Sequence, residues 1–180
     1  ANQYFPYYLD KANYISTTQS FGSGCPSSGG RIPNHTTSTT YLGSNWYMYV
    51  NQAPASALTF VFIDFRKQIP PILGDPFGAP GCSLLVNNFV SLGGTTSGGG
   101  SANWYVSLPD EALYHQAKLF TQVFCADSWA NAFGWISSNG VETTFGVRPR
   151  MTTIEHRGTT TNATGTVHRY DGTISLFTYQ

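Results

Sequence analysis

The sequence has little charge. Asp, Glu, Lys and Arg make up 10% of its 180 residues, nine acidic and nine basic, against roughly 25% in an average soluble domain. The formal net charge is zero, so charge repulsion cannot keep the molecules apart. Such a surface has to be wetted by hydroxyl and amide groups, or something else has to cover much of it. The first option indicates an extracellular protein, and the second indicates a subunit of an assembly.

The chain also lacks the features of several protein classes. It has no basic cluster to neutralise phosphates, which argues against a nucleic-acid partner. No apolar run approaches the roughly 20 residues of a membrane span. The start, Ala1-Asn2-Gln3, has no charged region followed by an apolar core. We therefore expect a mature chain without a signal peptide or a membrane span.

Cysteines are few and match no metal-binding pattern. Cys25, Cys82 and Cys125 stand alone, without a Cys-x-x-Cys pair or a paired histidine. A secreted protein would use them as one disulfide and one buried thiol, and an intracellular protein as three buried thiols. Glycosylation sequons begin at Asn34 and Asn162, so glycans on these two residues are candidate modifications.

Strand patterns dominate what is present. Residues 46–50 are aromatic and strand-prone, and residues 58–65 form an almost continuous apolar run, as expected for a strand buried on both faces. Further strands are predicted at 83–92, 103–108 and 118–125. In the last of these, Leu119, Thr121, Val123 and Cys125 share one face, and Phe120, Gln122 and Phe124 share the other. Turn signals at 78–81, 93–100 and 138–140 separate the strands, which indicates a sandwich or a barrel.

One helical turn and one hairpin complete the pattern. Proline and acidic residues favour a short helical turn near 109–116. Near the end of the chain, residues 166–170 and 173–179 flank Asp171-Gly172, the preferred type I′ turn pair, and predict a C-terminal hairpin. No repeat or low-complexity linker divides the chain. We therefore predict an all-β protein with a single β-sandwich of the jelly-roll or Ig-like kind.

Four motifs occur in order along the chain. Residues 20–29 read SFGSGCPSSG, residues 73–86 contain Leu-Gly and then FGAPGCSLLV, residues 108–122 begin Leu-Pro-Asp, and residues 130–140 read ANAFGWISSNG. Together they resemble a secreted β-sandwich domain that recurs in extracellular proteins of planctomycetes and other bacteria. The pattern is Gly-x-Gly-Cys-Pro … Gly-Cys-x-Leu … Ser-Asn-Gly, and it covers about residues 14–146.

The resemblance implies secretion, a β-sandwich fold and a disulfide between Cys25 and Cys82. Cys125 is not part of the pattern, and a Cys82–Cys125 bridge between neighbouring strands stays open as an alternative. The family has no established catalytic residues, so the resemblance implies a location and a fold but no reaction. Residues 1–13 lie outside it as an aromatic arm. Residues 147–180 also lie outside it, as C-terminal strands expected to pack on the same domain.

Candidate catalytic residues are few. Asp64 lies inside the apolar run and would need a partner, for which Arg66 on the same strand face is the first candidate. The four histidines, expected at the surface, are His35, His115, His156 and His168. The chain has no nucleophile elbow, and its glycine run lacks the lysine and helix of a phosphate-binding loop. We expect no enzyme, no metal and no cofactor, and a hydrolase using Asp64 or a histidine is the third interpretation.

Aromatic residues suggest an alternative function. Four tryptophans, if exposed on one face, would form a platform on which sugars stack. These are Trp46, Trp104, Trp129 and Trp135. Sandwiches usually bury tryptophan, so we expect most of them in the core. A monomeric secreted adhesion or carbohydrate-binding module is therefore the second interpretation.

The N-terminal arm carries the main functional prediction. Its first nine residues have no side-chain charge and five large apolar side chains. These are Tyr4, Phe5, Tyr7, Tyr8 and Leu9. In water they would form an adhesive patch that soluble monomers usually avoid. The whole arm of residues 1–13, when extended, reaches about 40 Å, so it can add to the exposed strand edge of a neighbouring molecule or fold back on its own domain.

The C-terminal hairpin is a second candidate for exchange, because its last strand is apolar on both faces. Its candidate anchors are Ile174, Leu176 and Phe177. We predict a structural subunit of an extracellular filament, pilus-like fibre or surface layer. The subunit would form a homo-oligomer or homopolymer by exchange of a terminal arm or strand between neighbours, a heterologous contact that propagates unless it closes into a ring.

Overall fold

The computed structural model describes residues 15–147, 151–155 and 166–170. The chain divides into two compact units, residues 1–147 and 148–180. The first unit contains ten β-strands and two short 3-10 turns in its described part, which confirms the predicted all-β sandwich. The helical turn predicted near 109–116 is the 3-10 turn Ala112–Tyr114. No helix in the described ranges is long and apolar enough to cross a membrane.

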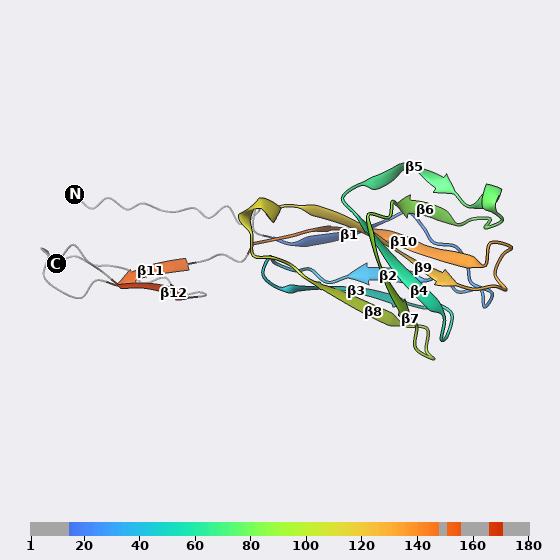
Figure 1. Ribbon diagram of the computed structural model, residues 1–180, viewed down its shortest axis with the longest axis horizontal. Coiled ribbons are helices and arrows are strands. Elements are labelled where there is room, and N and C mark those ends of the chain that lie inside the picture. Colours follow the sequence, from blue (N-terminus) through green and yellow to red (C-terminus); the bar gives the residue numbers. More distant parts are fainter. Residues whose placement is uncertain (1–14, 148–150, 156–165, 171–180) are drawn as a thin grey trace, which may run out of the picture. The chain divides into compact units, whose positions relative to one another are not determined.

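Three layers of strands make up the first unit (Figure 1). The central layer is an antiparallel sheet in the order β1 (Thr17–Phe21), β10 (Trp135–Thr144), β9 (Lys118–Ala126), β4 (Leu58–Asp64) and β7 (Val90–Thr95). On one side lies the sheet of β2 (Asn34–Thr37), β3 (Asn45–Asn51) and β8 (Ala102–Ser107). On the other side lies a hairpin of β5 (Lys67–Leu73) and β6 (Ser83–Val86).

The core lies between the five-stranded and the three-stranded sheets. Strict alternation along β3 buries Trp46, Met48 and Val50, which together with Val61 and Ile63 of β4 belong to one apolar cluster. We call the side of the five-stranded sheet that contacts this core its inner face. On β9 the inner face carries Val123 and Cys125, both fully buried, as the alternation in the sequence predicts.

Polar side chains also join the two sheets across the core. The His35 ring is fully buried, with Nδ1 2.8 Å from the Tyr49 carbonyl oxygen and Nε2 2.7 Å from the Thr121 hydroxyl. A carbonyl only accepts, so Nδ1 carries the proton and Nε2 accepts from Thr121. Burial lowers the pKa of His35 to about 4, although the bond to Tyr49 opposes the shift. His35 is therefore a neutral core residue, and the prediction of a surface histidine is wrong for it.

The Ser-Asn-Gly motif at 138–140, predicted as a turn, lies inside strand β10. A bulge interrupts the pairing between Ser137 and Gly140. It directs Asn139 at β2, where the Asn139 amide accepts from the His35 backbone N–H and donates to its carbonyl oxygen, both at 2.9 Å. Glycine is needed next, because a Cβ at position 140 would overlap the Phe21 ring. The motif is a strand irregularity set by its neighbours.

Two other strand predictions are corrected by the structure. The predicted strand 83–92 is two strands, β6 in the outer hairpin and β7 in the central sheet, separated at residues 87–89. The predicted loop 93–100 begins inside β7, which continues to Thr95. Strand β4 confirms the apolar run at 58–65, but it is fully buried on its inner face alone, and its other face is half-buried or exposed.

The described part of the second unit is one antiparallel strand pair. Strand β11 (Met151–Glu155) pairs with β12 (Thr166–Tyr170) in the register Met151↔Tyr170 to Glu155↔Thr166. The sequence predicts strand 166–170 but pairs it with residues 173–179, which lie outside the described residues. The packing of residues 147–180 on the sandwich stays a prediction.

Candidate functional site

An apolar groove lies between the outer face of the five-stranded sheet and the β5–β6 hairpin. Its volume is about 630 Å³. Six aromatic side chains line it: Phe60, Phe62, Phe77, Phe124, Phe133 and Trp135. The polar side chains in its lining are three serines, and among the described residues no charged side chain contributes. A groove of this composition binds apolar, uncharged groups.

The floor of the groove comes from alternate positions of adjacent strands. Phe60 and Phe62 of β4 pair with positions 124 and 122 of β9, so their rings lie on the outer face. The Phe62 and Phe124 rings are 4.7 Å apart between centroids, and those of Phe60 and Trp135 are 5.8 Å apart. These four side chains are half-buried. The floor is therefore a contiguous aromatic surface that the described residues cover incompletely.

The rim of the groove is still more exposed. Leu73 at the end of β5 is 59% exposed, and Phe77 in the turn that follows is 61% exposed. Phe133, in the turn before β10, faces the same groove and is 54% exposed. Large apolar side chains at this exposure are unfavourable in water when they are contiguous. The rim therefore extends the apolar surface beyond the floor.

The opposite end of the outer face is closed. Leu85, Val86 and Phe120 are buried in a small cluster against Phe21. The ammonium group of Lys67 lies 4.4 Å from the centre of the Phe21 ring, a cation–π contact that covers the cluster. The same ammonium group is 2.8 Å from Glu142. Together with the hydrogen bond from Lys118, this contact holds the pKa of Glu142 below its ordinary value.

Gln122 separates the closed end from the groove. Its side-chain oxygen accepts from the Leu85 backbone N–H at 2.8 Å, and its side-chain nitrogen donates to the Ser83 carbonyl oxygen at 2.8 Å. The amide thus occupies the edge of β6 that faces away from β5, as a neighbouring strand would. That edge is therefore not free to accept an added strand at these residues.

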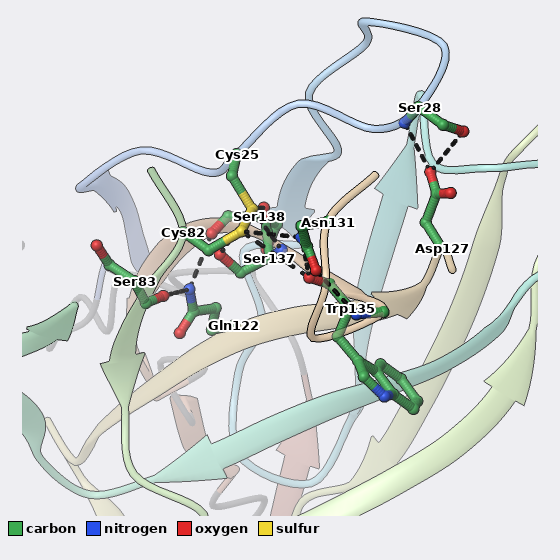
Figure 2. The surroundings of a disulfide bond; sticks show 11 residues. Cys25, Ser28, Cys82, Ser83, Gln122, Asp127, Asn131, Trp135, Ser137 and Ser138 are labelled. Carbon is green, nitrogen blue, oxygen red and sulfur yellow. Dashed lines mark hydrogen bonds between the residues drawn. A yellow bond between two sulfur atoms is a disulfide. The ribbon is translucent and has the colours of Figure 1, made fainter. Parts of the chain in front are cut away.

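A disulfide joins Cys25 to Cys82 next to the groove, as the family resemblance implies (Figure 2). The Cys25 backbone N–H donates to the Ser137 carbonyl oxygen at 3.0 Å, so the disulfide fixes the outer hairpin to the start of β10. Cys125 is a free, buried thiol, which rules out the alternative Cys82–Cys125 bridge. Burial raises the pKa of Cys125 to about 11, against a hydrogen bond to Thr59, so the thiol is unreactive at neutral pH.

Within the first unit, the described catalytic candidates form no common site. Asp64 is at the end of β4, half-buried, and its Oδ1 accepts from the backbone N–H of Arg66 at 3.0 Å rather than from the guanidinium group. His115 is exposed, His156 lies outside the described residues, and His168 stands opposite Thr153 in the second unit. No group of three His, Cys, Asp or Glu side chains that could hold a metal occurs in the described ranges.

The tryptophans do not form a platform. Trp46 and Trp104 are buried, Trp135 lines the groove, and Trp129 alone is fully exposed at 89%. A different aromatic cluster lies on the outer face of the three-stranded sheet. The ring centroid of Tyr47 is 6.3 Å from that of Tyr49, on which it stacks, and 5.9 Å from that of Tyr105. We call these three residues the tyrosine face.

The predicted interface anchors lie outside the described residues. They are Tyr4, Phe5, Tyr7, Tyr8, Leu9, Ile174, Leu176 and Phe177. Of the two sequon asparagines, Asn34 is exposed at the start of β2, and Asn162 lies outside the described ranges. The sequence did not predict the groove, although its signal is present in the apolar outward positions of β4.

Comparison with known proteins adds no relative. No protein-family model matches the chain, and searches of the curated proteins and of the solved structures found no match. The resemblance to the planctomycete-type secreted domain therefore stays a prediction from its motifs. What the chain does has to be argued from its own geometry.

Proposed function

We propose that this protein is a secreted structural subunit of an extracellular filament, pilus-like fibre or surface layer. Neighbouring subunits would exchange a terminal arm or strand, and the role would not be enzymatic. The observation that carries the proposal is the open aromatic groove on the sandwich. An uncharged, contiguous apolar surface of this kind is typical of a protein interface.

The disulfide supports the extracellular part of the proposal. Such bonds persist in oxidising environments and are rare where thiols are kept reduced. The low charge of the chain and the motifs of the secreted domain agree with this location. Glycans on Asn34, which is exposed, and on Asn162 are compatible modifications.

Strand direction supports assembly into a filament. β1 begins at Thr17 opposite Thr144, the last residue of β10, and runs toward the groove end of the sheet. Residues 15–16 before β1 and residues 145–147 after β10 therefore follow at the end of the sheet opposite the groove. A terminal segment that enters a neighbour's groove joins unlike surfaces of identical subunits. Such heterologous contacts propagate unless they close into a ring.

Deleting residues 1–13 tests the proposal. We expect the native protein to form filaments or layers in negative-stain micrographs and the truncated protein to elute as a monomer on size exclusion. A variant with Tyr4, Phe5, Tyr7, Tyr8 and Leu9 all changed to serine keeps the arm length and should also be monomeric. Changing Ile174, Leu176 and Phe177 to serine tests the other terminus in the same assay. Assembly that survives both sets of changes would rule out exchange of the termini.

The tyrosine face favours a second candidate, a monomeric adhesion or carbohydrate-binding module. Its three rings are exposed and contact one another, and polar side chains flank them, with Ser107 donating to Asn45 at 2.9 Å. Aromatic rings beside amide groups suit the mixed apolar and polar surface of a sugar. Glycan titration followed by intrinsic fluorescence should then respond in the wild type and not in Tyr47→Ala. The absence of any fluorescence change across a broad glycan panel would exclude this candidate.

A further inference from the structure

We propose that the groove is the acceptor site for the N-terminal arm of a second copy of this chain. In this arrangement the arm adds antiparallel to strand β7, and the side chains of Phe5, Tyr7 and Leu9 enter the groove. The inference rests on the proposed function and specifies its interface. Four features of the described residues and the sequence support it.

The chemistry of the groove matches the arm. In the described part of the chain, its lining offers aromatic and aliphatic side chains with three serines and no charge, so a charged occupant would lose hydration without gaining a partner. Residues 1–9 carry no charged side chain and five large apolar ones. A volume of about 630 Å³ lies in the range of roughly 300–1,000 Å³ that encloses several rings. The arm can therefore fill the groove without burying a charge.

The direction of β1 indicates that the arm in the groove comes from a second copy of the protein rather than from the same chain. Thr17, Thr144 and Lys118 lie in one row across the sheet, and Ser137 and Phe124 of the groove lie in another. The two rows are about 20 Å apart along β9. To reach its own groove, the arm would have to reverse at residue 15 and run back along the sheet. An arm that instead continues away from the sheet can reach the groove of a neighbour.

Strand β7 offers a strand edge beside the groove. Among the described residues it pairs with β4 alone, so it is the last strand of the five-stranded sheet on the groove side. The Gly93 carbonyl oxygen points away from β4 and already accepts from the Trp104 ring N–H at 3.2 Å, so an added strand would bond to its second lone pair. By alternation the Ser91 carbonyl oxygen also points away from β4, and the Ser91 side chain lines the groove. Gln122 already occupies the competing edge, on β6.

Proline at position 6 sets which residues of the arm can pair. Pro6 has no N–H, so the side of the arm that bonds β7 should be that of Phe5, Tyr7 and Leu9. In an antiparallel pair, directly opposed residues direct their side chains to the same face of the sheet. The residues opposite Ser91 and Gly93 thus direct their side chains to the outer face, where the groove lies. Tyr4 and Tyr8 then lie on the other face of the added strand.

Disulfide trapping in the full-length chain tests the arrangement. Ser91→Cys is combined in turn with Phe5→Cys, Tyr7→Cys or Leu9→Cys, and with Tyr8→Cys as the matched control on the opposite face. Single-cysteine variants show background, which should be low because Cys125 is buried. After oxidation we expect a ladder of covalent multimers on non-reducing gels for at least one odd-numbered position. The Tyr8→Cys control should give none.

The outcomes separate this inference from the proposed function. An internal bond within monomers would show that the arm occupies its own groove and would overturn the exchange. A ladder with Ile174→Cys or Phe177→Cys in place of the arm cysteines would overturn the arm as occupant. Filaments that depend on residues 1–13 but give no cross-link to Ser91→Cys would overturn the groove and leave the filament function standing.

A rim substitution gives a second measurement that does not depend on cysteine geometry. Phe77 is 61% exposed, so Phe77→Glu should leave the fold intact and place a charge at the groove. We expect the protein concentration needed for assembly to rise roughly tenfold or more. Tyr105→Glu, at a residue 60% exposed on the tyrosine face, is the matched control and should leave assembly unchanged. Equal effects of the two substitutions on assembly would count against the groove as the acceptor site.

Discussion

The inner and outer faces of the five-stranded sheet carry similar apolar side chains, but the chain covers them to different extents. Strand β4 shows the contrast within seven residues. Val61 and Ile63 on its inner face are at most 4% exposed, whereas Phe60 and Phe62 on its outer face are half-buried and line an open groove. The inner face is covered by a three-stranded sheet and the outer face by a single hairpin.

The difference shows that a fold can leave an apolar surface uncovered although the side chains on that surface resemble those of the core. The hairpin buries one end of the outer face with Leu85, Val86 and Lys67, and in the described part of the chain no strand covers the other end. Apolar area left in water forgoes about 25 cal/mol per Å² that burial would supply. Assembly through that end would recover this free energy between subunits. Substitutions on the two faces should therefore differ in their effects on stability and assembly.

The largest effect should come from the disulfide, which belongs to the outer layer. Replacing both Cys25 and Cys82 with alanine should lower the free energy of unfolding by about 4 kcal/mol, because the bond closes a loop with a sequence separation of 57. Urea denaturation at neutral pH measures the loss. Cys125→Ala, at a free buried thiol on the inner face, is the control for cysteine removal. A loss below 1 kcal/mol would show that the outer layer is held without the disulfide.

Neighbouring residues of β4 compare the two faces directly. Ile63→Ala on the inner face should cost about 3 kcal/mol, because it opens a cavity in the closed core. Phe62→Ala on the outer face should cost the monomer about 1 kcal/mol, since its ring is half-buried and its site is open. Urea denaturation of the 14–180 fragment, which we expect to be monomeric, separates the two values. Equal costs would indicate that the outer face is as closed as the inner one.

A pH titration tests the buried histidine of the inner face. The folded-state pKa of about 4 for His35 lies below its ordinary value of 6.5, so the unfolded state binds the proton first as the pH falls. The stability contributed by His35 is present above pH 6.5 and should decline by about 2 kcal/mol between pH 8 and pH 5. His35→Gln should remove most of this slope, measured by thermal unfolding. An unchanged slope would assign the pH dependence to another group.

The smallest effect is expected at the closed end of the outer face. Glu142→Gln removes the ion pairs with Lys67 and Lys118, and pairs whose lysines are partly exposed contribute less than about 1 kcal/mol. The pKa of Glu142 is held low, so this contribution is present above the ordinary pKa of a glutamate and is lost as the pH falls below it. Urea denaturation of the wild type and of Glu142→Gln at pH 7 and pH 3 measures this contribution and its loss at low pH. A larger loss at pH 7 would mean that the Lys67–Glu142 pair holds the hairpin on the central sheet.

Several elements were predictable from local pattern. The alternation in 118–125 assigned the faces of β9, and the apolar run at 58–65 located β4. The Cys25–Cys82 disulfide followed from a motif resemblance and is present. The Ser-Asn-Gly turn was wrong because Asn139 and Gly140 meet distant residues of β2 and β1, which no local pattern contains. Strand β5, with two adjacent prolines, was missed because it lies in a two-stranded layer that tolerates them.

The sequence by itself determined that the strands are apolar on alternate positions and that the arm carries aromatic residues without charge. Only the tertiary structure decided which apolar face the chain covers. Coverage depends on strands distant in sequence, since β3 and β8 close the inner face and β5 and β6 close half of the outer one. Periodicity reports that a side chain favours burial, but the burial itself is supplied by whatever packs above it. For the outer face of β4, we infer that a second molecule supplies this burial.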